Sequence, residues 1–414
     1  MRGLLGVAVL MLVAWLISEN RWRIPIRVVV TGIALQFVLA ILFVKFPPAA
    51  SMFLVLNQGV DALQRATDAG TSFVFGYLGG GPLPFDEKQP GLNYIFAFRA
   101  LPLVLTISAL ASLLFYWGVL QVIVKAFAWV LRRAMGIGGA LGLGAAVHIF
   151  VGNIEAPLLV RPYLQRMERG ELFALMTCGM AGIAGTVMVL YASILGPVIP
   201  DALGHILIAS VISTPAGIAV AALMVPFETN ADAEAHLSLG EPMLSSVDAL
   251  AKGTADGIVF LLNIIAMLIV AIACVSLVNM ALSWIPPIGG DPVTLQRLFA
   301  YVFRPIMWLI GVPTSDIAAA SSLMATKTVL NEFIAYVDMA KIPADGISPQ
   351  TRLILTYAMC GFANFGSAGI MIGGMTAMAP ERKRDIVGLG LRSIVSGTLA
   401  TCMSGAVVGM IMIA

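Results

Sequence analysis

Long apolar stretches separated by short polar segments dominate the chain. The clearest apolar runs cover residues 3–18, 27–46, 97–122, 172–196, 203–226, 257–285, 352–379 and 386–414. An α-helix needs about 20 predominantly apolar residues to cross the hydrocarbon core of a bilayer. The pattern therefore predicts an all-α polytopic membrane protein with about eight transmembrane helices.

Composition agrees with this prediction. Of the 414 residues, 59% are hydrophobic and only 11% are charged, whereas soluble domains average about 25% charged residues. The first apolar run ends at the polar segment 19–23 without a small-residue cleavage site. We therefore interpret this run as a retained helix and not as a signal peptide.

Two segments are too polar to face lipid and too apolar to be loops. Segment 139–160 is interrupted at Gly152-Asn153 and stopped by Pro157, and segment 312–337 opens with Pro313-Thr314-Ser315-Asp316. Irregular backbone is tolerated at membrane depth where it is buried in protein or lines a cavity. Both segments are predicted to be re-entrant helical hairpins that enter the membrane without crossing it.

The two hairpins occupy similar places in two halves of the chain. Each is followed by an apolar run that we expect to form a long helix, with a Gly-rich stretch at 179–186 in the first and at 361–367 in the second. Paired interrupted segments of this kind point to inverted repeats and to a transporter site at the repeat interface.

Other segments complete the predicted organisation. Segments 51–83 and 118–135 have the amphipathic pattern of interfacial helices, and the acidic stretch 227–245 is predicted to be an aqueous loop. The basic loops at 21–27 and 381–384 favour the cytoplasmic side. We divide the chain into N-terminal scaffold and interfacial helices (1–135), a first transport half (136–226), an acidic loop with a long scaffold helix (227–300) and a second transport half (301–414).

Two carboxylates, Glu155 and Glu332, lie in these hairpins within otherwise apolar sequence. A carboxylate at bilayer depth costs at least a few kcal/mol, so it usually faces a polar cavity and serves a function. Two structural alternatives remain open: Glu332 pairs with Lys327, or Glu155 caps a helix beside Pro157.

Polar residues cluster around the two carboxylates. The amides and hydroxyl concerned belong to Asn153, Asn331, Asn364 and Ser367. They could act as interhelical hydrogen-bond partners, each contributing about 1 kcal/mol in a membrane, or they could bind a polar solute. His148 stands next to the first hairpin motif and is either a packing residue or a titratable group near a coupling-ion site.

Several function classes lack their usual motifs. The four cysteines are isolated in apolar segments, no His, Cys or Asp cluster has transition-metal spacing, and no phosphate-binding loop or nucleophile elbow occurs. No basic tract suggests binding to nucleic acid. We expect no enzyme cofactor.

Four motifs resemble the bacterial concentrative nucleoside transporter family, and the resemblance covers nearly the whole chain. They are Gly152-Asn153-Ile154-Glu155-Ala156-Pro157, Gly311-Val312-Pro313, Asn331-Glu332-Phe333 and Phe362-Ala363-Asn364. The resemblance implies a homotrimer in the cytoplasmic membrane, in which a transport domain moves against a scaffold and a cation gradient drives nucleoside uptake.

The resemblance also implies roles for individual residues. Glu332, Asn364 and Ser367 would bind the ribose hydroxyls, and Asn153, Ile154 and Glu155 would face the base of a nucleoside of the uridine or adenosine class. Val187 and Phe362 would line the pocket. The backbone carbonyls of Val151 and Ile183 would contribute to a sodium site.

This chain departs from the sodium-dependent pattern in ways that leave the coupling ion open. His148 and Gly182 stand where an Asn and a Ser would supply sodium ligands, and Asn153-Ile154 stands where Gln-Thr is common. Either sodium or a proton could therefore be coupled. A uniporter or channel-like facilitator, an intramembrane enzyme that uses Glu155 and Glu332 as an acid–base pair, and a purely structural membrane protein are the alternatives.

Overall fold

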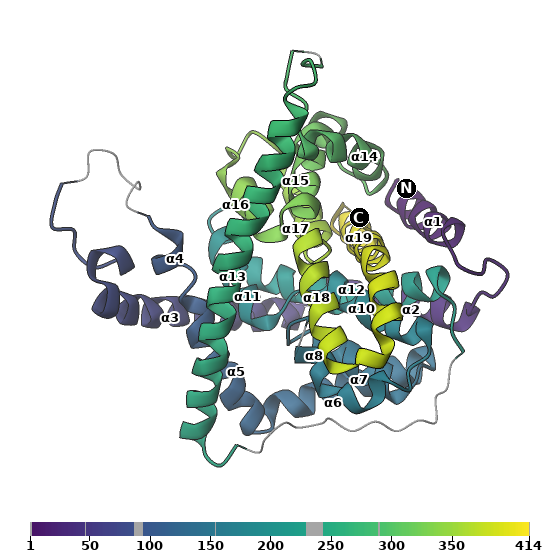
Figure 1. Cartoon of the computed structure of the whole chain (residues 1–414), viewed down its shortest axis with the longest axis horizontal. Helices are drawn as coiled ribbons and strands as arrows, with labels where there is room; N and C mark the ends of the chain where they lie inside the picture. The colour runs from purple at the N-terminus through teal and green to yellow at the C-terminus, as the bar shows by residue number, and fades with distance from the viewer. Residues whose placement is uncertain are drawn as a thin grey trace.

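A computed structural model describes residues 2–45, 47–86, 94–153, 155–228, 243–288 and 290–413. In these residues the secondary structure is helical throughout, apart from one isolated β-bridge between Ile288 and Asp291. Figure 1 shows the helices packed into a bundle, with the long helix α13 running along one side of it. The predicted all-α fold is confirmed for the described part of the chain.

The N-terminal third supplies long helices and one amphipathic helix. Its elements are α1 (Arg2–Leu16), α2 (Ile26–Lys45), α3 (Pro47–Phe75), η1 (Gly76–Gly79), α4 (Phe96–Arg99), α5 (Leu103–Tyr116) and α6 (Val119–Met135). The buried residues of α6 are Val124, Ala128, Leu131 and Met135. They recur every three or four positions and therefore lie on one face of the helix.

Each half of the remaining chain contains a helical hairpin, a broken helix and a long helix, in that order. The first set is α7 (Gly139–His148), α8 (Glu155–Leu159), α9 (Arg161–Leu164), α10 (Arg169–Ala181), α11 (Gly185–Leu195) and α12 (Ala202–Met224). The second set is η2 (Thr314–Asp316), α15 (Ile317–Val329), α16 (Glu332–Lys341), α17 (Pro349–Met359), α18 (Phe365–Met378), η3 (Pro380–Arg382) and α19 (Lys383–Ile413). Between the two sets lie α13 (Ser246–Leu282) and α14 (Leu295–Leu309).

Six helical stretches in the described residues are long and apolar enough to span a membrane. They are Ile26–Lys45, Phe96–Tyr116, Arg169–Leu195, Ala202–Met224, Ser246–Leu282 and Pro380–Met412. The predicted run 3–18 forms the 15-residue helix α1. The predicted loop at 227–245 falls largely on residues outside the described part.

Two runs that were predicted as continuous helices are interrupted. Run 172–196 is divided between α10 and α11, and run 352–379 between α17 and α18. The prediction of unbroken helices was wrong because hydropathy does not register where the backbone leaves the helical conformation. At the first break, Gly182 and Ala184 are both extended, and at the second Asn364 is extended and caps α18.

The core lies around α12 and not around α13. In its most apolar window α12 is 94% buried, whereas α13 is only 11% buried. The helix α13 packs mainly on α5. The two helices approach closely at Gly253, where a Cβ atom would lie only 2.7 Å from the carbonyl oxygen of Ser108. Its outward face is apolar and includes Val259, Leu262 and Ile269, as expected where lipid or another subunit replaces water.

Candidate functional site

The second hairpin places Glu332 at the start of a helix. α15 ends at Val329, and Asn331 accepts a hydrogen bond through Oδ1 from the backbone N–H of Ile334 at 2.9 Å, which caps α16. Glu332 is the first residue of α16 and is only 3% exposed. A carboxylate is favoured at this position because the helix N-terminus carries partial positive charge.

Glu332 accepts hydrogen bonds from two other helices. The hydroxyl of Tyr191 in α11 donates to Oε1 at 2.7 Å, and Nδ2 of Asn364 donates to Oε2 at 2.9 Å. The carboxylate thereby connects α16 with α11 and with the break between α17 and α18. Of the residues predicted from sequence, the structure brings Glu332 and Asn364 into direct contact.

Asn364 uses both ends of its side-chain amide. While Nδ2 contacts Glu332, Oδ1 accepts from the backbone N–H of Ser367 at 2.8 Å and so caps α18. Asn364 is 1% exposed, and Ser367 is half-buried one turn further along. The cap therefore fixes the orientation of the amide toward the carboxylate.

Aromatic rings cover this polar cluster. Phe333 packs against Phe96 with ring centroids 4.5 Å apart. The ring centroids of Tyr191 and Tyr336 are 5.3 Å apart. Sequence reasoning did not identify Tyr191 as a site residue. The available signal was its position one helical turn after Val187, which is buried in α11 and was predicted to line the pocket.

The two helix breaks meet each other. The backbone N–H of Phe362, in the second break, donates to the carbonyl oxygen of Gly182, in the first break, at 3.2 Å. The N–H of Gly185 donates to the carbonyl oxygen of Phe150, which follows α7, at 3.1 Å. The first hairpin, both breaks and the second hairpin thus form one contiguous region.

Asn153 and His148 face the same glycine of α10. A Cβ atom at Gly179 would lie 2.9 Å from Oδ1 of Asn153 and 3.0 Å from Cε1 of His148. Both side chains are buried, and Nε2 of His148 has no hydrogen-bond partner in the described part of the chain. The proposed base-facing residue and the coupling-ion candidate are therefore neighbours.

The remaining predicted positions surround these contacts. Ile183 is buried in the first break, and its N–H donates to Ser210 Oγ at 3.5 Å. Val151, which follows α7, and Phe362 are half-buried. Ile154 lies outside the described residues, and so does the side chain of Glu155.

Lys327 does not form the ion pair with Glu332 that the sequence left open. Both residues are buried, yet no ion pair between them occurs among the described residues. The Nζ atom of Lys327 has no hydrogen-bond partner there.

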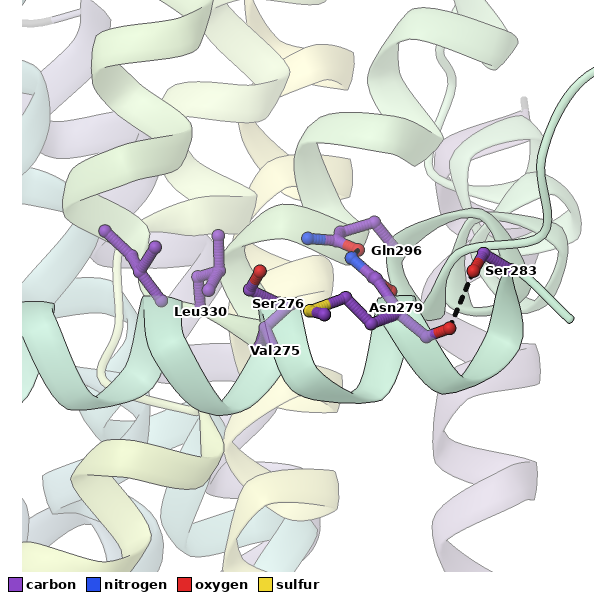
Figure 2. A pocket seen from close by; sticks show the side chains of 8 residues that line it. Val275, Ser276, Asn279, Ser283, Gln296 and Leu330 are labelled. Carbon is purple, nitrogen blue, oxygen red and sulfur yellow. Dashed lines mark hydrogen bonds between the residues drawn. The ribbon is translucent and has the colours of Figure 1, made fainter.

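A cavity of about 400 Å³ opens beside the tip of the second hairpin. It is lined by Ile272, Val275, Ser276, Asn279, Met280 and Ser283 of α13, with Gln296 and Leu330. Figure 2 shows Leu330 at one end and Asn279 facing Gln296, where the two amides form a hydrogen bond of 3.0 Å. Leu330 directly precedes Asn331, so the space adjoins the hairpin that carries Glu332.

The family matches cover most of the chain. Residues 5–78 match the family described as "Na+ dependent nucleoside transporter N-terminus", and residues 205–409 match its C-terminal counterpart. Residues 97–198 match a family described as "Nucleoside recognition". The chain belongs to the concentrative nucleoside transporter family.

Individual members of this family align along almost their full length. An "Uncharacterized transporter" of Haemophilus influenzae is 37% identical, with 99% of this chain and 97% of the relative covered. "Nucleoside permease NupC" of Helicobacter pylori is 30% identical, with 99% and 97% covered. The inward-facing, substrate-bound structure of CNTnw superimposes with a TM-score of 0.87 at 34% identity and covers 99% of this chain and 98% of that one.

This membership makes the chain a multi-pass membrane transporter of the nucleoside transporter family. The relatives and the solved neighbour are transporters and not enzymes, which removes the acid–base enzyme from the alternatives. The description of the matched family includes sodium dependence.

Proposed function

We propose that the chain is a secondary active transporter that imports nucleosides across a bacterial cytoplasmic membrane by cation symport. The observation that carries this proposal is the buried contact between Glu332 of the second hairpin and Asn364 of the second helix break, next to the point where the two breaks meet. A carboxylate and an amide in a low-dielectric cavity hydrogen-bond vicinal hydroxyls strongly.

In the proposed site, Glu332, Asn364 and Ser367 hold the ribose of a uridine- or adenosine-class nucleoside. A hydroxyl of the sugar takes the place of the Tyr191 hydroxyl on Glu332. Asn153, Ile154 and Glu155 face the base, with Val187 and Phe362 against its flat surface. The contact between Gly182 and Phe362 supports this division because it brings the first helix break next to the second.

The proposed arrangement in the membrane has eight crossings, two re-entrant hairpins and interfacial helices α3 and α6. The start of α1 and the end of α19 lie close together, since a Cβ atom at Gly3 would lie 2.5 Å from Cγ of Met410. Helix ends on the same side of the membrane support an even number of crossings. The two halves are inverted repeats, and three subunits associate through the scaffold that includes α5 and α13. The helices α5 and α13 contact each other more extensively than they contact the other helices, which favours an elevator-like movement. The cavity beside Leu330 gives the tip of the second hairpin room to move.

The coupling ion is a proton in our proposal, with sodium as the alternative. Gly182 offers no side-chain oxygen, and His148 places an imidazole at the other ligand position. A Cβ atom at Gly182 would lie 3.7 Å from the carbonyl oxygen of His148, so the two positions adjoin. His148, Glu155 or Glu332 would carry the proton.

Uptake of radiolabelled uridine and adenosine into proteoliposomes tests the proposal. Inward proton and sodium gradients are imposed separately, and the internal label is identified chemically. We expect intact nucleoside to accumulate above its external concentration under the proton gradient. Equilibration without accumulation under either gradient would identify a uniporter, and accumulation only with sodium would assign that ion.

A further inference from the structure

Lys327 has a costly environment that the proposed site leaves unexplained. It lies in the last turn of α15, five residues before Glu332, and its side chain is completely buried. Lysine normally extends its flexible stem until the ammonium group reaches water. Here Nζ is enclosed, without a hydrogen-bond partner in the described part of the protein. A buried ammonium group is costly unless a nearby opposite charge compensates it.

The ionisable groups within electrostatic range of Lys327 come from three elements. They are the carboxylate of Glu332 in α16, the thiol of Cys360 at the break after α17 and the thiol of Cys402 in α19. Glu332 is the only carboxylate among them. The charge on Lys327 therefore acts on Glu332 through space, without a direct contact.

The surroundings of Glu332 lead to the same pairing. Besides Lys327, the polar groups around it are Tyr191, Tyr336, Cys360 and Asn364. All four are uncharged donors or weak acids. Lys327 is thus the basic group that acts on this carboxylate within the described residues.

We propose that Lys327 is a positioning residue for nucleoside recognition, whose buried ammonium favours the ionised form of Glu332 while leaving both carboxylate oxygens available to hydroxyl and amide donors. A direct ion pair would occupy one of these oxygens. In the structure both accept from the neutral donors Tyr191 and Asn364, and a sugar hydroxyl can replace such a donor. This inference rests on the proposed role of Glu332 in holding ribose.

Nucleoside binding as a function of pH tests the role in recognition. Purified Lys327→Met and Lys327→Arg are titrated with uridine and adenosine between about pH 6 and pH 9. Lys341→Met is the matched control, because Lys341 ends the same hairpin but is exposed and contacts Asp338. All four proteins, including the wild type, are compared in the same detergent.

Without the ammonium, Glu332 takes up a proton and offers a neutral hydrogen bond in place of a charge-assisted one. We expect Lys327→Met to bind roughly tenfold more weakly near pH 6 and to recover toward wild type as the pH rises. Lys327→Arg and Lys341→Met should retain wild-type binding at each pH. Binding by Lys327→Met that is unchanged, or is weakened equally at every pH, would overturn the proposal.

Thermal unfolding without nucleoside separates the charge pairing from the binding site. We compare Lys327→Met, Glu332→Gln and the double variant, and we expect the double variant to be more stable than the two single losses predict, because it leaves no uncompensated charge. Additive losses would overturn the pairing regardless of what binds. If the stability losses are coupled but Glu332→Gln binds nucleoside like the wild type, the charge pairing stands and the role in recognition is overturned. The nucleoside site would then lie elsewhere.

Discussion

At the scale of single residues, each carboxylate oxygen of Glu332 already accepts a hydrogen bond within the protein. Tyr191 and Asn364 each donate to one of its oxygens. In the proposed site, a sugar hydroxyl replaces one of these donors. Tyr191 is the easier one to displace, because Asn364 is held in place by its second bond to Ser367.

This competition predicts the behaviour of Tyr191→Phe. Loss of a hydrogen bond to a buried carboxylate should lower the stability of the nucleoside-free protein by about 1.5–3 kcal/mol. Added nucleoside should raise the melting temperature of the variant more than that of the wild type, since a ribose hydroxyl supplies the missing donor. Tyr357→Phe is the control, because its hydroxyl contacts His205 and not Glu332. Equal shifts in both variants would exclude the competition.

The sequence predicted the carboxylate and its amide partner but not the tyrosine. Glu332, Asn331 and Asn364 stand out because polar residues are costly in apolar sequence. Tyr191 does not stand out, since a tyrosine in an apolar helix has many ordinary packing roles. Its position becomes apparent only when α11 is folded against α16.

At the scale of helices, the two breaks are the features that hydropathy could not locate. Glycine clusters at 179–185 and 361–374 are compatible with close packing of continuous helices as well as with interruption. The structure shows interruption at both clusters. The backbone groups freed there bond across the breaks, as in the hydrogen bond from the Phe362 N–H to the Gly182 carbonyl oxygen. The hydrophobic pattern therefore predicted the helical class correctly, but not the points where two of the predicted helices stop. That the two hairpins are re-entrant stays a prediction.

The first break also predicts how ion coupling can be changed. A Cβ atom at Gly182 would make only ordinary contacts, 3.5 Å from the Cys178 carbonyl oxygen and 3.7 Å from that of His148. Gly182→Ser should therefore fold without strain. Combined with His148→Asn, it supplies two side-chain oxygens of the kind that hard cations such as sodium prefer, and uptake in proteoliposomes should gain sodium dependence.

Each single variant is the control for this pair, and we expect each to respond less to sodium than the double variant does. Strong sodium stimulation of the unmodified protein at fixed pH would contradict the prediction. It would indicate that backbone carbonyls and water are sufficient ligands for the ion.

At the scale of the whole molecule, one ionic network joins the ends of three helices. Arg169 at the start of α10 contacts Glu19, which follows α1, at 3.0 Å and Asp385 in α19 at 2.7 Å. Arg392 of α19 contacts Glu19 as well. Residues far apart in the chain are thereby held at one side of the bundle, together with the basic loop before α2.

Removing the shared carboxylate should weaken this network modestly. The Glu19 and Arg169 side chains are 33% and 40% exposed, so Glu19→Gln should cost about 0.5–1 kcal/mol in the free energy of unfolding at low salt. The loss should shrink at about 1 M salt, where the Debye length is only about 3 Å. Glu228→Gln, which breaks the exposed pair with Arg23, is the control and should have almost no effect. A loss that is equally large at both salt concentrations would show that Glu19 acts through packing.

Nucleoside binding by purified Glu332→Gln tests the central claim most directly. Asp338→Asn is the matched control, because Asp338 is a more exposed carboxylate on the same helix and contacts Lys341. The account predicts that the control binds uridine and adenosine like the wild type, while Glu332→Gln remains folded but binds roughly ten- to a hundredfold more weakly. Wild-type affinity in a folded Glu332→Gln protein would contradict the proposed site.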